Sequence, residues 1–185
     1  MKVYKYDKKY NFKSMFDTNT GFYVRSGILD KNNKDTGIDP FRASFPELLD
    51  IGIMGHCMHG ITGMCTIGCY QSGHKIKKQN MTLDNFKRII DECEKKVFQV
   101  ALGGRGDPDQ HENFSQILEY SRSKNIVPNF TSSGFGFNEK IVDLCKEFCG
   151  AVAISYYGKW QKIKVRRKTE HKDNDTKDRK ETLIW

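Results

Sequence analysis

The 185-residue chain is long enough for one ordinary domain with its own core, so stability requires neither a disulfide nor a metal. The N-terminus, MKVYKYDKKYNFK, has no apolar signal-peptide segment, and no stretch approaches the ~18 apolar residues of a membrane span, which predicts a cytoplasmic protein. Thiols stay reduced there, so the six cysteines are expected to be buried residues, metal ligands or redox groups rather than disulfides.

The net charge of +8 is concentrated near the end of the chain. Residues 159–185 contain ten Lys or Arg and five Asp or Glu, a net of +5, together with both tryptophans. This segment has no Gly, Pro or Cys and little apolar periodicity, so we expect a charged, disordered tail. Its interleaved aspartates dilute any phosphate-binding stripe, which argues against nucleic acid as a partner.

Residues 1–47 are polar and aromatic, and the turn formers in DTNTGFYVRSGI favour a short hairpin in a small N-terminal appendage. From residue 48 the pattern becomes regular. LLDIGIM predicts a buried strand, and TLDNFKRIIDECEKK predicts a helix with Thr82 as its N-cap. The apolar face of this helix comprises Leu83, Phe86, Ile89, Ile90 and Cys93.

Strands and helices continue to alternate after this helix. VFQVAL, IVPNFT and AVAIS predict strands, although Pro128 removes one ladder donor from the second of them. HENFSQILEYSRSKN predicts a helix, and NEKIVDLCKEFCG predicts another that begins at Asn138 and ends at Gly150. Such alternation predicts right-handed crossovers and a parallel sheet. We therefore expect an α/β core over residues 48–158, a half barrel or a small doubly wound sheet, with its ligand face at the C-terminal strand ends.

Cysteines and histidines gather in GHCMHGITGMCTIGCYQSG, the loop after the first strand of this core. Seven and then three residues separate Cys57, Cys65 and Cys69, which fits none of the usual short ligand pairs. On this spacing alone, an iron–sulfur cluster and a zinc site are equally good interpretations. The histidines available to a zinc site are His56, His59 and His74.

The loop, taken together with the next strand end, GGRGDPDQHENF, resembles the radical S-adenosylmethionine (radical SAM) enzymes. In that family three loop cysteines bind a [4Fe–4S] cluster, and a GGEP-like motif binds the methionine end of S-adenosylmethionine. GDPDQHENF is similar to the family pattern GEPLLHPDF: Asp107 stands at the acidic position, and His111 and Phe114 keep their spacing. The resemblance covers residues 48–157 and includes the strand ends TSSG and AISYY.

The resemblance implies a partial radical SAM-type (β/α) barrel with a [4Fe–4S] cluster and S-adenosylmethionine as cofactors. The implied iron ligands are Cys57, Cys65 and Cys69. The implied cofactor contacts are Gly103, Gly104 and Asp107 at the methionine end, and Tyr70 and Ser133 at the adenine or ribose. Three thiolates leave one iron of the cluster open, where S-adenosylmethionine binds and is cleaved reductively. A peptide or small-molecule substrate and an external electron donor such as flavodoxin or ferredoxin are the implied partners.

The chain departs from the family pattern at two places. The family's cysteines are commonly separated by three and then two residues with an aromatic before the last, whereas here Tyr70 follows Cys69. At Gly158, where the family continues with further strand–helix units, the composition changes abruptly. This change is typical of a truncated or frame-shifted product, which would be an inactive remnant of the enzyme, and a natural short variant with a basic tail is the alternative. The second hypothesis is a zinc-stabilised binding module whose basic tail contacts nucleic acid or an acidic partner.

Four other candidate residues are predicted to be structural. Cys93 and Cys145 lie on apolar helix faces and Cys149 lies at a helix end, so all three are expected to be buried as small apolar side chains. His111 is expected to cap the start of a helix or to lie on the surface.

Overall fold

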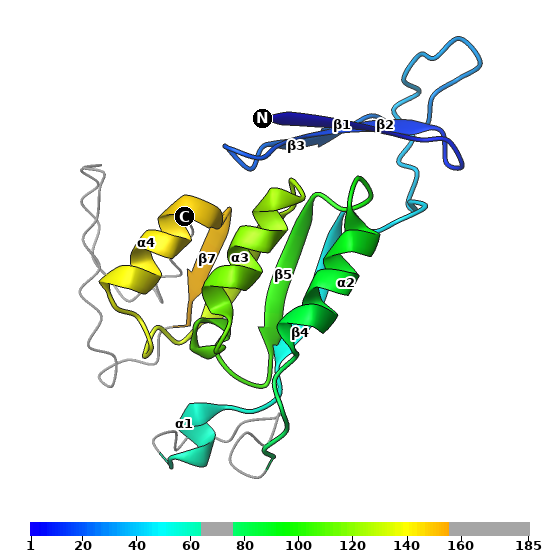
Figure 1. Ribbon diagram of the computed structural model, residues 1–185. Helices are drawn as coiled ribbons and strands as arrows, with labels where there is room; N and C mark the ends of the chain where they lie inside the picture. The colour runs from blue at the N-terminus through cyan, green and yellow to red at the C-terminus, as the bar shows by residue number, and fades with distance from the viewer. Residues whose placement is uncertain (64–75, 156–185) are drawn as a thin grey trace, which may run out of the picture.

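The computed structural model describes residues 1–63 and 76–155. A four-stranded parallel sheet forms the centre of the molecule, in the order β4-β5-β6-β7 (Figure 1). The strands are β4 (Leu48–Met54), β5 (Gln99–Gly104), β6 (Val127–Ser132) and β7 (Ala151–Ile154). The predicted α/β class with parallel strands is therefore confirmed. Cys65, Cys69, Tyr70, His74 and the predicted tail lie outside the described residues.

Three helices cover one face of this sheet (Figure 1). They are α2 (Leu83–Cys93), α3 (Phe114–Ser123) and α4 (Glu139–Phe148), and a single helical turn, α1 (Met58–Ile61), follows β4. The predicted caps are confirmed, because Thr82 accepts a hydrogen bond from the Asn85 N–H and Asn138 accepts one from the Ile141 N–H.

The helix boundaries differ from prediction at four ends. α2 ends at Cys93 instead of Lys96, and α3 ends at Ser123 instead of Asn125. The helix predicted from residue 111 begins instead at Phe114, because residues Pro108–Gln110 form a separate 3₁₀ turn, η1. The helix predicted to end at Gly150 ends at Phe148, where Cys149 takes an extended conformation as the C-cap. These differences lie at the terminal turns of the helices, where capping geometry rather than apolar periodicity sets the boundary.

The main core lies between the sheet and the three helices. Its fully or almost fully buried side chains include Ile53, Val100, Leu102 and Phe130 from the strands, with Phe86, Ile90, Ile117 and Leu118 from the helices. Burying these apolar side chains is the main favourable term in folding. Pro128 does not disrupt β6, because it is the second residue of the strand and its carbonyl accepts a hydrogen bond from the Gly150 N–H.

The opposite face of the sheet carries small and polar residues, as the strand register shows. Asp50, Ala101, Asn129 and Ala151 lie side by side across β4 to β7. The Asn129 amide donates a 2.9 Å hydrogen bond to the Gln99 side chain on the neighbouring strand. Among the described residues no helix covers this face. The two faces therefore differ in kind, with an apolar face for packing and a polar face for contact with water or ligand.

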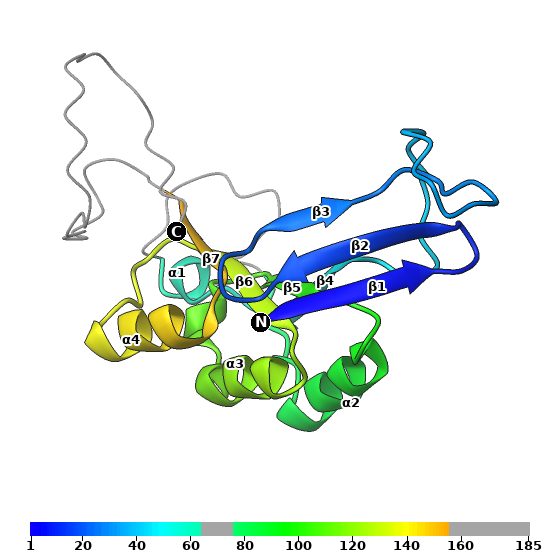
Figure 2. The same cartoon turned by 90° about the horizontal axis from the view of Figure 1, so that it is seen from above.

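A second, antiparallel sheet lies over the N-terminal ends of the parallel strands (Figures 1 and 2). It consists of β1 (Lys2–Asp7), β2 (Phe12–Asp17) and β3 (Tyr23–Arg25), in that order. The predicted hairpin corresponds to β2 and β3, whereas β1 was not predicted. The two sheets pack through Phe16 against Phe98 and Val127, with the Phe16 and Phe98 rings 5.5 Å apart. Within the described residues, no helix combines the length and apolarity needed to cross a membrane.

Candidate functional site

The candidate site lies where β4, β5 and β6 end, at the edge that a parallel sheet offers to ligands. Cys57 follows β4 as the N-cap of α1, Asp107 follows β5 as the N-cap of η1, and Ser133 follows β6 directly. The three residues come from three separate loops. Their convergence follows from the shared direction of the strands.

Two adjacent glycines at the end of β5 have different structural roles. Gly104 has a φ of +123°, and a Cβ there would overlap the backbone of Met54 in β4. Close packing of β5 on β4 therefore requires glycine at residue 104. At Gly103, by contrast, the nearest atom to an added Cβ would be Asp50 Oδ1 at 3.7 Å, an ordinary contact. Gly103 is thus the more open of the two residues predicted to approach a ligand.

Gly106 brings the cysteine loop against the loop that follows β5. A Cβ at Gly106 would overlap the His56 carbonyl oxygen and lie only 3.1 Å from the Cα of Cys57. The structure therefore places the first predicted iron ligand in direct backbone contact with the predicted cofactor motif. Cys57 is a half-buried, free cysteine.

Asp107 is held by side chains from both neighbouring loops. Its Oδ1 accepts a 3.0 Å hydrogen bond from the Ser133 N–H, and its Oδ2 accepts one from the Ser133 hydroxyl. The same Oδ2 lies 3.0 Å from Nε2 of His59. Only 13% of the His59 side chain and 16% of the Asp107 side chain are exposed, so this contact is largely shielded from water. Hydrogen bonds to a carboxylate are stronger than those between neutral groups.

His59 connects further residues to this group. Its Nε2 lies 3.0 Å from the Gln110 amide nitrogen and 3.2 Å from the Ser133 hydroxyl, and its ring packs on Phe135 with centroids 4.8 Å apart. We call Asp107, His59, Ser133 and Gln110 the Asp107 cluster. It joins the loops after β4, β5 and β6 into one polar unit.

A second carboxylate lies beneath the Asp107 cluster. Asp109 is only 7% exposed, and its Oδ1 accepts a 2.6 Å hydrogen bond from the Ser132 hydroxyl. Its Oδ2 is buried and has no hydrogen-bond partner among the described residues. Burial raises the pKa of Asp109, because the charged form loses its hydration.

His111 is buried, so the surface alternative of its prediction is wrong, whereas its place at the start of α3 agrees with the helix-start alternative. Its Nε2 lies 2.9 Å from the Met81 carbonyl, and its Nδ1 accepts from the Asn113 N–H. Nε2 therefore carries the proton in this arrangement. The side chain ties the start of α3 to the segment that returns from the cysteine loop, a role that spacing alone does not reveal.

Several solved structures resemble this fold, whereas no family model matches the sequence and no curated protein matches it either. Streptococcus suis SuiB bound to S-adenosylmethionine superposes with a TM-score of 0.53 at 11% identity, over 77% of this chain and 43% of SuiB. SuiB bound to the precursor peptide SuiA gives a TM-score of 0.50 at 12% identity, over 77% of this chain and 44% of that one. BtrN in complex with AdoMet and 2-DOIA gives 0.45 at 11% identity, over 57% and 43%.

SuiB is a radical SAM enzyme. This chain has a partial radical SAM-like fold. It spans less than half the length of SuiB, and at this identity the likeness concerns the fold alone.

Within the radical SAM-like fold, the structure brings together part of the predicted site. Cys57, Gly103, Gly104, Asp107 and Ser133 all lie at the C-terminal edge of the sheet. Cys93 is buried, while Cys145 and Cys149 are partly buried against the same core, in line with a structural role. The contacts of Gln110 and Phe135 with His59 could not be predicted from local patterns, since both residues are distant from His59 along the chain.

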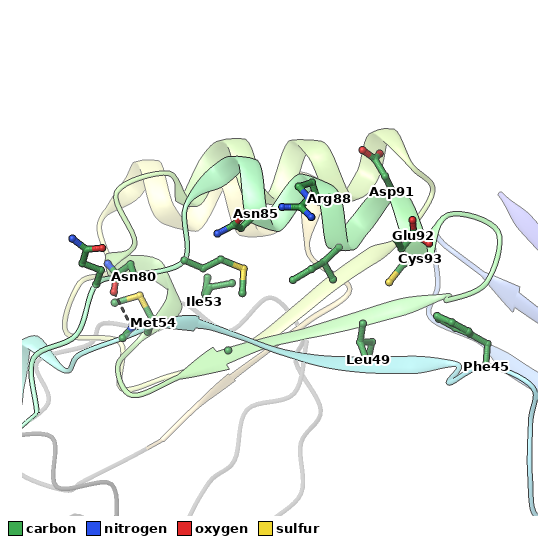
Figure 3. Close-up of a pocket in the computed structure, with 15 residues that line it drawn as sticks. Phe45, Leu49, Ile53, Met54, Asn80, Asn85, Arg88, Asp91, Glu92 and Cys93 are labelled. Carbon is green, nitrogen blue, oxygen red and sulfur yellow. Dashed lines mark hydrogen bonds between the residues drawn. The ribbon is translucent and has the colours of Figure 1, made fainter.

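A groove of about 1030 Å³ lies elsewhere on the radical SAM-like fold, between α2 and the edge strand β4 (Figure 3). Asn85 and Arg88 of α2 lie above Leu49 and Ile53 of β4 in this view (Figure 3). Of the predicted site residues that the structure describes, none lines this groove.

Proposed function

We propose that this chain binds a [4Fe–4S] cluster and S-adenosylmethionine and generates a radical on a substrate of the peptide class. The observation that supports the proposal is the backbone contact between Gly106 and Cys57, because Gly106 belongs to the segment predicted to bind the cofactor and Cys57 is the first cysteine of the loop. The radical SAM-like fold also supports the proposal that this chain binds these two cofactors. When bound, the cluster supplies the electron that cleaves the sulfonium of S-adenosylmethionine and leaves a carbon radical.

The donor set fits this pair of cofactors. Cys57, Cys65 and Cys69 would hold iron as thiolates, and three thiolates leave a coordination position for an amino-acid ligand. Asp107 would accept hydrogen bonds from the ammonium of the methionine group, since Ser133 already fixes the orientation of its carboxylate. The open backbone at Gly103 allows a ligand to approach the end of β5 closely. Ser133, and Tyr70 with it, would contact the nucleoside.

A peptide substrate is supported by SuiB, whose structure was solved with the precursor peptide SuiA. The polar face of the parallel sheet offers amide and carboxylate groups from Gln99, Asn129 and Asp50, which are suited to peptide amides. We also propose that an external one-electron donor, such as flavodoxin or ferredoxin, reduces the cluster.

Metal analysis under anaerobic conditions tests the proposal. Reconstituted protein should be brown and carry about four irons per chain. Cys57→Ala should lose the colour, whereas Cys145→Ala, a change on α4, should keep it and serves as the matched control. A colourless protein that contains zinc and unfolds when chelated would instead establish the zinc-stabilised module.

Calorimetric titration with S-adenosylmethionine tests the second half of the proposal. Asp107→Asn should weaken binding to the reconstituted protein by about tenfold or more, because a charge-assisted hydrogen bond contributes roughly 1.5–3 kcal/mol. Gly103→Ala should weaken binding while leaving the fold intact. Unchanged affinity in both variants would rule out this edge of the sheet as the cofactor site.

A further inference from the structure

The N-terminal sheet has one packed face and one open face. Val3, Phe16 and Tyr23 lie on the packed face, in contact with the core around Phe98. On the open face the register aligns Tyr4 of β1, Met15 of β2 and Val24 of β3 in one row. Tyr4 is 70% exposed and Val24 46% exposed, so this apolar row faces solvent. Tyr6 and Phe22 extend the exposed row on either side.

Among residues 1–63 and 76–155, no strand pairs with the outer edge of β1. β1 is the first strand in the sheet order, and of these residues only β2 pairs with it (Figure 2). The Thr18 N–H donates to the Met1 carbonyl, and backbone groups in an antiparallel pair alternate between facing the partner and facing away. This alternation points the N–H and C=O groups of Lys2, Tyr4 and Tyr6 away from β2, at the free edge.

Basic side chains surround this edge. Lys2 and Lys13 lie on the open face beside the tyrosines, and Lys8 and Lys9 lie in the exposed turn that follows β1. Lysines on an edge strand repel the same edge of a second copy, which disfavours self-association through β1. The same charges attract an acidic strand.

We propose that an extended acidic peptide binds the N-terminal sheet by adding a strand to the free edge of β1, with apolar side chains packed on Tyr4 and its row. Main-chain hydrogen bonds to Lys2, Tyr4 and Tyr6 give affinity, and the lysines select acidic partners. The inference rests on the proposed peptide substrate: this surface holds one part of that substrate while another part reaches the site.

The geometry is compatible with such tethering. The N-terminal sheet lies at one end of the parallel strands, and the Asp107 cluster lies at the other end (Figure 1). A six-residue strand such as β5 spans roughly 20 Å, so a linker of about ten extended residues is long enough to connect the two places.

A direct binding measurement tests the inference. The probe is a fluorescein-labelled twelve-residue peptide of alternating Glu and Val, titrated by fluorescence anisotropy with the full chain without cluster or S-adenosylmethionine. Binding should weaken about tenfold between 50 and 300 mM NaCl, because exposed charges are screened. A peptide with Lys in place of Glu, and one with Pro at alternate positions, should not bind, since one reverses the charge and the other removes backbone donors.

Variants of β1 separate backbone pairing from side-chain contact. Tyr4→Pro removes an outward N–H and should weaken binding at least tenfold more than Tyr4→Ala does. The double variant Lys2→Glu, Lys13→Glu should weaken binding about tenfold, and Lys140→Glu on α4 is the matched charge-reversal control. Circular dichroism establishes that each variant is folded.

The outcomes that would overturn the inference are specific. Equal affinity for the acidic and basic peptides, or displacement of the acidic peptide by a twelve-residue oligothymidylate, would contradict an acidic strand. A doubled molecular mass that falls on Tyr4→Pro substitution would make a second copy the occupant of the edge. Failure of the protein to bind the cluster or S-adenosylmethionine would refute the proposed function and not this inference. The peptide titration is made without the cluster and without S-adenosylmethionine, so its result does not depend on them.

Discussion

His59 Nε2 lies 3.0 Å from Asp107 Oδ2, although 48 positions separate the two residues in the sequence. The contact joins the loop after β4 to the loop after β5, and Ser133 adds the loop after β6. Three strand ends are therefore tied together by side chains before any cofactor enters. A site organised in this way loses less entropy when it binds a ligand.

Removing His59 should loosen these loops. His59→Ala leaves Asp107 without one of its partners, so the free energy of unfolding should fall by about 1–2 kcal/mol. Amide hydrogen exchange over residues 132–137 should become faster. His56→Ala is the matched control, because the His56 ring contacts the Lys78 carbonyl and should leave exchange at residues 132–137 unchanged. Equal exchange in both variants would show that His59 does not hold the loops together.

The adjacent glycines of β5 should respond differently to the same substitution. Gly104→Ala forces a positive φ on alanine and drives its Cβ into Met54, so urea denaturation should show a loss of about 3 kcal/mol. Gly103→Ala meets only an ordinary contact and should change stability by less than about 1 kcal/mol. Similar losses in the two variants would contradict the close packing of Gly104 on β4.

Asp109 should make stability depend on pH. Burial raises its folded pKa above the unfolded value, so the folded state binds the proton more tightly and Asp109 destabilises the fold as pH rises through that pKa. Asp109→Asn keeps the acceptor for Ser132 and should be more stable than wild type at pH 7. This advantage should shrink as the pH falls toward 4, measured by urea midpoints. Asp143→Asn, on the exposed surface of α4, provides the control.

Lys5 should give the opposite trend at alkaline pH. Its Nζ lies 3.7 Å from the Phe98 ring centroid, and burial lowers its pKa to about 8. The unfolded chain therefore binds more protons between about pH 8 and pH 10.5, and stability should rise with pH across that window. Lys5→Met should be more stable than wild type at pH 7, and the difference should narrow by pH 9.5. A constant difference would show that Lys5 is not buried as a cation. Lys140→Met is the control for general loss of charge.

The regular part of the core was predictable because its signals are local. Periodic apolar residues placed β4 at its observed ends, and side-chain chemistry identified Thr82 and Asn138 as caps. The N-terminal strand β1 escaped prediction, because its alternating Lys and Tyr residues present no continuous apolar side. Its packed side is instead built from Val3 and from Lys5, whose Nζ lies over the Phe98 ring, together with Phe16 of β2 and Tyr23 of β3.

The candidate site was predictable in location but not in contacts. Parallel strands direct their following loops to one edge, so Cys57, Asp107 and Ser133 were expected near one another from the order of elements alone. The contacts of Asp107 and Ser133 with His59 were not expected, since the sequence indicated His59 only as a candidate zinc ligand. The same local reasoning left His111 as either a helix-start cap or a surface residue, and the structure buries it at the start of α3.

The sequence by itself determined the alternation of strands and helices, the apolar face of α2, and the edge of the sheet where chemistry is expected. These properties follow from periodicity and capping, which act over a few residues. Only the tertiary structure decided that His59 contacts Asp107 and that Gly104 must pack on Met54. It also decided that β1 is the outermost strand of its sheet, with no further strand beside it among the described residues. Those contacts depend on the paths of loops and on the register between strands, and both are set by packing across the whole domain.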